Sequence, residues 1–159
     1  MKLAVTHSHN HGDHAAGGEQ FRLKPFITLV GASVDEMSEF FQLDNWPHEI
    51  GVFVLGNQRH LAVIFIAEYE RASLNFYDCL TGLLFTGDSF YSSRLYISNF
   101  IAYFQSISLL IDFIQSNHVG TAFSLSTQIE MTNTSQINYP TGTTYQPNER
   151  ILPVSIQQL

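Results

Sequence analysis

The chain contains, directly after a short apolar run, the stretch Thr6-His7-Ser8-His9-Asn10-His11-Gly12-Asp13-His14. Four of its seven histidines and an aspartate therefore lie within nine residues. Imidazole and carboxylate groups at this density gain most when a cation that prefers nitrogen and oxygen ligands lies between them. A purification tag is a homopolymeric run at a terminus, whereas this stretch alternates. The pattern therefore favours a metal site over a tag or a solvated polar loop.

The spacing within the stretch predicts two metal ions rather than one. Residues two apart in an extended segment point the same way, so His9 and His11 can offer nitrogens to one ion. Asp13 and His14 lie beyond the turn and can bind a second ion a few ångströms away. Two ions about 3.5 to 4 Å apart hold a bridging hydroxide as nucleophile and bind the oxygens of a substrate during hydrolysis.

Size and composition indicate a single globular domain over residues 1–159, with 45% apolar and 13% aromatic residues. Fourteen acidic residues against seven basic ones give a net charge of -7, so no nucleic acid is expected as a partner. The lone Cys79 excludes an internal disulfide. No apolar run reaches the roughly 20 residues that span a bilayer, and residues 3–5 are too few for a signal-peptide core. We therefore expect no membrane partner and a cytoplasmic location.

The order of the expected elements is typical of a layered α/β architecture with its site on loops at strand ends. A capping-box pattern at residues 33–36 predicts a helix through about Phe41, and apolar residues at helical spacing predict a helix over 100–115. Residues 132–150 are rich in Thr, Asn, Gly and Pro and are expected to be irregular. Strands are expected at 3–5, 27–30, 52–55, 61–66, 74–77, 83–86 and 122–125.

Two motifs together resemble the metallo-β-lactamase superfamily. Its signature H-x-H-x-D-H is matched by His9, His11, Asp13 and His14. A second stretch, Thr81-Gly82-Leu83-Leu84-Phe85-Thr86-Gly87-Asp88, is similar to the family's strand ending in Gly-Asp, where the aspartate bridges both metals. The separation of about 74 residues between His14 and Asp88 also fits the family. The resemblance implies a metallo-β-lactamase-like αββα sandwich with one or two zinc ions, iron or manganese being less favoured. The metal ligands that it implies are His9, His11, Asp13, His14 and Asp88.

Two further ligand histidines of the family are replaced in this chain. Tyr69 stands about nineteen residues before the Gly-Asp aspartate, and Gln128 follows the strand after the long helix. A phenol and an amide oxygen are poorer zinc ligands than imidazole. The resemblance therefore implies weakened metal sites, with Tyr69 and Gln128 hydrogen-bonding to substrate or water. Coordination of ferric iron by a Tyr69 phenolate, or of a metal by Glu68 or Glu70, is a less favoured alternative.

The motifs and their surroundings lead to four further expectations. His7 is expected to hydrogen-bond to a ligand rather than bind metal itself. Asp13 is expected to act also as the catalytic proton shuttle, as the resemblance implies. Several strands precede the H-x-H-x-D-H loop in the family, so the domain is expected to be N-terminally shortened. Missing strands leave uncovered sheet edges and apolar surface, which favour a homodimer.

These features predict a metal-dependent hydrolase that uses a metal-activated water. Its small-molecule substrate would carry an ester, lactone, thioester, amide or phosphoester bond, and the fold class does not narrow the choice. The replaced ligands favour a second hypothesis, a degenerate family member that acts as a binding or interaction protein with weak or no catalysis. A third is a simple metal-binding or metal-storage module.

Overall fold

The chain combines strands and helices in the computed structural model, which describes residues 2–45, 49–66, 71–90, 95–117, 139–140 and 142–145. This is a mixed α/β arrangement, which confirms the predicted fold class at that level. The elements are β1 (Leu3–Val5), α1 (Gly12–Ala15), the 3-10 helix η1 (Gly18–Phe21), β2 (Ile27–Leu29), α2 (Val34–Phe41), β3 (Ile50–Gly56), β4 (Arg59–Phe65), β5 (Leu74–Asp78), β6 (Leu83–Phe85) and α3 (Phe100–Ser116).

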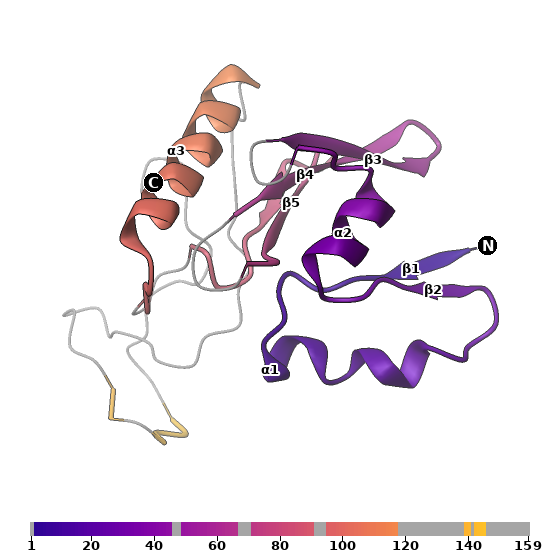
Figure 1. The fold of residues 1–159 in the computed structure, drawn as a ribbon, viewed down its shortest axis with the longest axis horizontal. Coiled ribbons are helices and arrows are strands. Elements are labelled where there is room, and N and C mark those ends of the chain that lie inside the picture. The colour runs from indigo at the N-terminus through magenta and orange to yellow at the C-terminus, as the bar shows by residue number, and fades with distance from the viewer. Residues whose placement is uncertain are drawn as a thin grey trace.

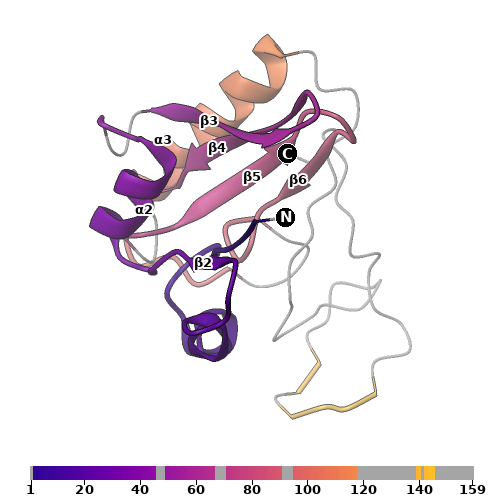
Figure 2. The ribbon, with the colours of Figure 1, turned by 90° about the vertical axis from the view of Figure 1, so that its right-hand side faces the viewer.

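The strands form two sheets. β3, β4, β5 and β6 make an antiparallel sheet in chain order, whereas β1 and β2 form a separate parallel pair. The β3–β4 connection is a two-residue turn in which Asn57 and Gln58 have φ of 49° and 63°. Two central residues with positive φ are typical of the type I′ turn, whose twist matches that of the flanking strands. Figure 2 shows the four strands of the larger sheet side by side.

Helices α2 and α3 pack on opposite faces of the four-stranded sheet (Figure 1). Successive residues of β4 point to opposite faces, so Ala62 and Ile64 pack with Leu110 of α3, whereas Val63 packs with Met37 of α2. All five side chains are buried. Because both faces of β4 are covered, its residues 61–65 are all apolar and do not alternate with polar residues.

The helices and strands predicted within the described residues are present in the structure, with small differences at their ends. The capping box at α2 is confirmed, since the Ser33 hydroxyl accepts from the Glu36 N–H and the Glu36 carboxylate accepts from the Ser33 N–H, both at 3.3 Å. The strand expected at 122–125 and most of 132–150 lie outside the described residues. None of the described helices has the length and apolar character that a bilayer crossing requires.

The turn between β5 and β6 is stabilised by the buried carboxylate of Asp78. Its oxygens accept hydrogen bonds from Arg59 Nη2 at 2.5 Å, Thr81 Oγ1 at 2.8 Å and the Leu80 N–H at 3.0 Å. The Arg59 guanidinium, helped by the Thr81 hydroxyl and the Leu80 amide, lowers the pKa of Asp78 to about 2. The carboxylate thus links the start of β4 to the end of β5.

Substituting Asp78→Ala is expected to lower the free energy of unfolding by about 1 to 3 kcal/mol, because the turn loses the hydrogen bonds from Arg59, Leu80 and Thr81, one of them from a charged guanidinium. Urea unfolding measures the loss, and Asp112→Ala, at an exposed position of α3, is the control. Since the folded pKa of Asp78 is depressed, its contribution is complete above the unfolded pKa near 4 and disappears as the pH falls towards 2. Equal destabilisation by the two variants at pH 7 would contradict this role.

Candidate metal centre

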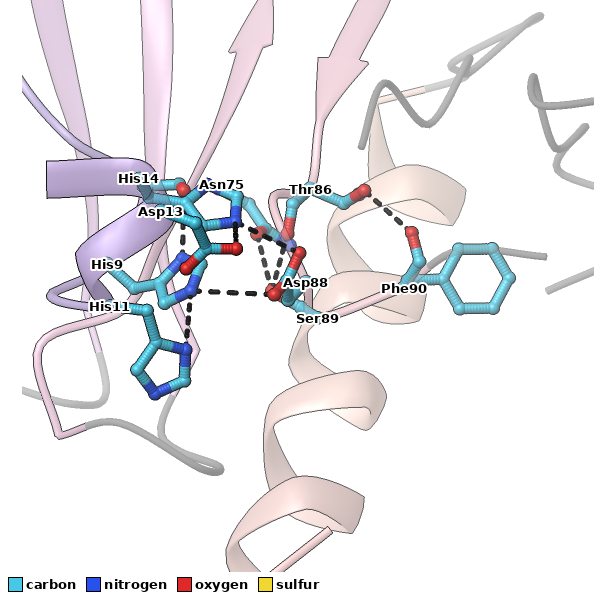
Figure 3. Close-up of polar contacts among 10 residues, drawn as sticks. His9, His11, Asp13, His14, Asn75, Thr86, Asp88, Ser89 and Phe90 are labelled. Carbon is cyan, nitrogen blue, oxygen red and sulfur yellow. Dashed lines mark hydrogen bonds and ion pairs between the residues drawn. The ribbon is translucent and has the colours of Figure 1, made fainter. Parts of the chain in front are cut away.

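The histidine-rich loop is tied to the large sheet and folds back on itself. The Ser8 carbonyl accepts from the Leu74 N–H at 2.7 Å, which joins the loop to the start of β5. The His11 carbonyl accepts from the His14 N–H at 3.0 Å and from the Ala15 N–H at 2.8 Å, which begins α1. This turn brings the His14 ring to 4.1 Å from the His9 ring, measured between centroids (Figure 3).

Asp88 reaches the cluster on the turn that follows β6, and Gly87 makes this approach possible. Gly87 has φ of +52°, a conformation that disfavours other residues. A Cβ atom at this position would lie 2.7 Å from Ser8 Oγ and 2.8 Å from Ser8 Cβ. Both the backbone conformation and the lack of space therefore require glycine here. The Asp88 turn lies directly against the histidine loop as a result.

The two oxygens of Asp88 face two different histidines. Oδ2 lies 3.6 Å from His9 Nε2, and Oδ1 lies 3.4 Å from His14 Nε2 (Figure 3). His9 Nε2 is also 3.0 Å from His11 Nδ1, and His14 Nε2 is 3.6 Å from Asp13 Oδ2. The donors thus form two sets that share one carboxylate, His9, His11 and Asp88 in one set and Asp13, His14 and Asp88 in the other.

The donor separations match those of a tetrahedral metal site. Bonds of about 2.0 to 2.1 Å place neighbouring tetrahedral ligands roughly 3.3 Å apart. The separations in the cluster run from 3.0 to 3.6 Å, and the donor atoms of each set all lie within 4.8 Å of one another. The nitrogen and oxygen donors suit zinc and the other divalent first-row metals. The residues present therefore fit one or two such ions.

One end of the cluster is buried and the other is open to solvent. The His9 side chain is 4% exposed, whereas that of Asp13 is 52% exposed and that of Asp88 is 24% exposed. An ion or a water molecule can therefore enter from the Asp13 end. A hollow of about 410 Å³ lies elsewhere, beside α2, and none of its lining residues belongs to the cluster.

His9 is held in its neutral form. Burial, followed by the neighbouring imidazoles of His14 and His11, lowers the pKa of His9 from 6.5 to about 4, against a smaller opposing effect of Asp13. Its Nδ1 atom lies 3.0 Å from the Ser8 hydroxyl, which leaves Nε2 directed at His11 and Asp88. Metal ions bind the neutral imidazole, so this environment favours coordination over protonation.

The structure brings together five of the residues singled out in the sequence, namely His9, His11, Asp13, His14 and Asp88. Tyr69 and Gln128 lie outside the described residues. Among the residues that are described, His7 is buried against Gly18 and forms no hydrogen bond to the cluster. The polar contact with His9 comes instead from Ser8.

Comparison with known proteins adds little to this geometry. No protein-family model matches the chain, and no curated protein matches it. A solved structure titled "Peroxy diiron species of chemotaxis sensor ODP" is similar with a TM-score of 0.48 and 11% identity, over 76% of this chain and 61% of that chain. The chain therefore spans less than two thirds of that protein's length. Likeness at this level transfers neither fold nor function.

These findings correct the assignment of the chain to the metallo-β-lactamase superfamily, which was wrong. The H-x-H-x-D-H and Gly-Asp patterns are short and follow from the chemistry of metal ligands and of a tight turn, so they do not identify a family by themselves. The αββα sandwich and the ligand positions inferred at Tyr69 and Gln128 lose this support. The described residues show one four-stranded sheet and a two-stranded pair. The donor cluster rests on its own geometry.

Substituting Gly87→Ala is expected to weaken metal binding by about tenfold or more, because the new Cβ displaces Ser8 and with it His9. Gly56→Ala is a matched control, since Gly56 also has positive φ, at +88°, but nothing lies within 4 Å of its added Cβ. Isothermal titration with zinc measures both affinities. Equal affinities in the two variants would show that the close approach of Gly87 and Ser8 does not matter for binding.

In the presence of a metal chelator, the free energy of unfolding of the protein is expected to fall as the pH is lowered from 6.5 to 4. His9 binds a proton in the unfolded chain below about 6.5 but in the folded chain only near 4, so the unfolded state takes up more protons in this range. His9→Gln should flatten this part of the profile of urea midpoint against pH. Ser38→Ala, on α2, removes no titratable group and is the control. A slope that survives His9→Gln would contradict the assignment.

Proposed function

We propose that the chain is a metal-dependent hydrolase whose centre is the cluster of His9, His11, Asp13, His14 and Asp88. The observation that supports the proposal is the position of Asp88, whose two oxygens face His9 and His14 separately. A carboxylate shared between two donor sets is the arrangement that two neighbouring metal ions require. Zinc is the metal that we propose, because the donors are imidazole and carboxylate at tetrahedral spacing.

Each residue has a distinct role in this proposal. His9 and His11 would hold one ion, Asp13 and His14 would hold the other, and Asp88 would contribute to both donor sets. Bound ions would lower the pKa of a water molecule and polarise the carbonyl or phosphoryl oxygen of the substrate. Asp13 is the more exposed of the two carboxylates in the cluster. We therefore propose that it also accepts the proton released during hydrolysis.

The open end of the cluster sets the direction of substrate approach. His9 is enclosed by the Ser8 loop and the Asp88 turn, whereas the side chain of Asp13 is about half exposed. A small ester, lactone, thioester, amide or phosphoester therefore reaches the centre from the Asp13 side. The homodimer and the cytoplasmic location expected from the sequence stay predictions.

The variant Asp88→Asn tests the proposal most directly, because it changes the one group shared by both donor sets. We expect metal affinity to fall by more than about 100-fold, since loss of an outer hydrogen-bonding partner alone costs about 10 to 100-fold. Hydrolysis of p-nitrophenyl acetate and bis(p-nitrophenyl) phosphate by zinc-loaded protein should fall with it. Asp35→Asn, in the first turn of α2, is the matched control.

A second candidate function is metal binding without catalysis. It is favoured by the number of donors, since each set has three His or Asp residues in the part of the chain that the structure describes. The same experiment separates the two functions. Stoichiometric zinc binding that Asp88→Asn abolishes, with no hydrolysis above the metal-free rate, would favour a binding protein. Absence of metal binding in the unchanged protein would contradict both.

A further inference from the structure

Asn75 is a fully buried polar residue at the second position of β5. It is 0% exposed, and it pairs across the sheet with the buried Ile64 of β4. Its neighbours along the strand, Leu74 and Phe76, belong to the apolar packing on α2. An amide in such surroundings lowers stability unless its polar atoms are hydrogen-bonded. Its Nδ2 atom has no partner among the described residues, so packing alone does not explain an asparagine here.

The amide oxygen of Asn75 contacts the turn that carries Asp88. The buried Ser89 hydroxyl lies 2.9 Å from Asn75 Oδ1 and 2.7 Å from the Thr86 carbonyl oxygen (Figure 3). The Ser89 N–H donates to the same Thr86 carbonyl at 3.0 Å, and the Thr86 hydroxyl donates to the Phe90 carbonyl at 2.7 Å. These bonds close the turn over residues 86–90, with Asp88 inside it.

We propose that Asn75 and Ser89 are positioning residues that fix the orientation of Asp88 between the two donor sets. This inference rests on the proposed metal centre. Asp88 must direct one oxygen at His9 and the other at His14, which requires a turn with a single conformation. The turn projects from the end of β6, and the Ser89–Asn75 bond ties it sideways to β5.

The Asn75 amide has two possible orientations, which differ in the hydrogen bond that it forms with Ser89. A serine hydroxyl has one hydrogen and cannot donate fully to both Asn75 Oδ1 and the Thr86 carbonyl. If the amide group is flipped by 180°, Nδ2 donates to Ser89 Oγ and the Ser89 hydroxyl donates to the Thr86 carbonyl. The orientation of an amide group is assigned from its hydrogen-bonding pattern. In either orientation one polar atom of Asn75 has no partner among the described residues. Residues that lower stability in this way are expected at functional sites.

Zinc titration of Asn75→Leu and Ser89→Ala, followed calorimetrically, tests the proposal. Leucine has the same number and branching of side-chain heavy atoms as asparagine, although its methyl groups are bulkier, and it removes the unpaired amide atom, so the melting temperature should change little. Zinc affinity should nevertheless fall by about 10 to 100-fold in each variant. The visible absorption of bound cobalt(II) should change as well, because it reports the geometry of the ligands. Ser38→Ala is the control, since this hydroxyl on α2 is buried and has no partner among the described residues.

The double variant Asn75→Leu with Ser89→Ala should bind zinc no more weakly than the weaker single variant, because both changes remove one interaction. Unchanged zinc affinity and cobalt spectrum in folded variants would overturn the positioning role and leave the metal centre standing. If Asn75→Leu does not fold, the zinc affinity and cobalt spectrum of Ser89→Ala alone test the positioning role. Absence of zinc binding in the unchanged protein would overturn the metal centre, and the positioning role with it.

Discussion

The close contact between Gly87 and Ser8 is the constraint on which the rest of the site depends. The cluster is assembled from two segments about 74 residues apart, and no side chain fits where they meet. The Ser8 carbonyl binds β5 on one side, and the Ser8 hydroxyl contacts His9 on the other. A shift of the Asp88 turn would therefore move the histidine loop as well. This coupling allows one carboxylate to face donors from both ends of the loop.

The sequence predicts what is local and misses what is not. The helix α2 follows from its capping box, and the donors of the histidine loop follow from their spacing, because both patterns lie within a few residues. Ser8, Asn75 and Ser89 were missed because their roles depend on contacts across the fold. A lone asparagine between apolar strand residues was the only sequence signal for them. The two motifs predicted donor chemistry and wrongly predicted a family, because ligand spacing reflects chemistry rather than descent.

The two donor sets are unequal in their surroundings. His9 is buried, and its lowered pKa keeps a lone pair available for a cation at neutral pH. The side chain of Asp13 is half exposed, so its carboxylate retains much of its hydration. Screening by water weakens electrostatic attraction at this end of the cluster. In the proposed centre, an ion at His9 and His11 would therefore be better shielded from exchange than one at Asp13 and His14.

Three features of the site each lower the stability of the metal-free fold. His9 is buried among other imidazoles, Asn75 has an unpaired amide atom, and Gly87 gives the unfolded chain extra conformational freedom. All three lie on the segments that carry the donors or adjoin them. A ligand that binds only the folded state stabilises it in proportion to its affinity and concentration. The proposed metal ions would offset these unfavourable features, whereas the apolar packing on α2 and α3 does not need any of these groups.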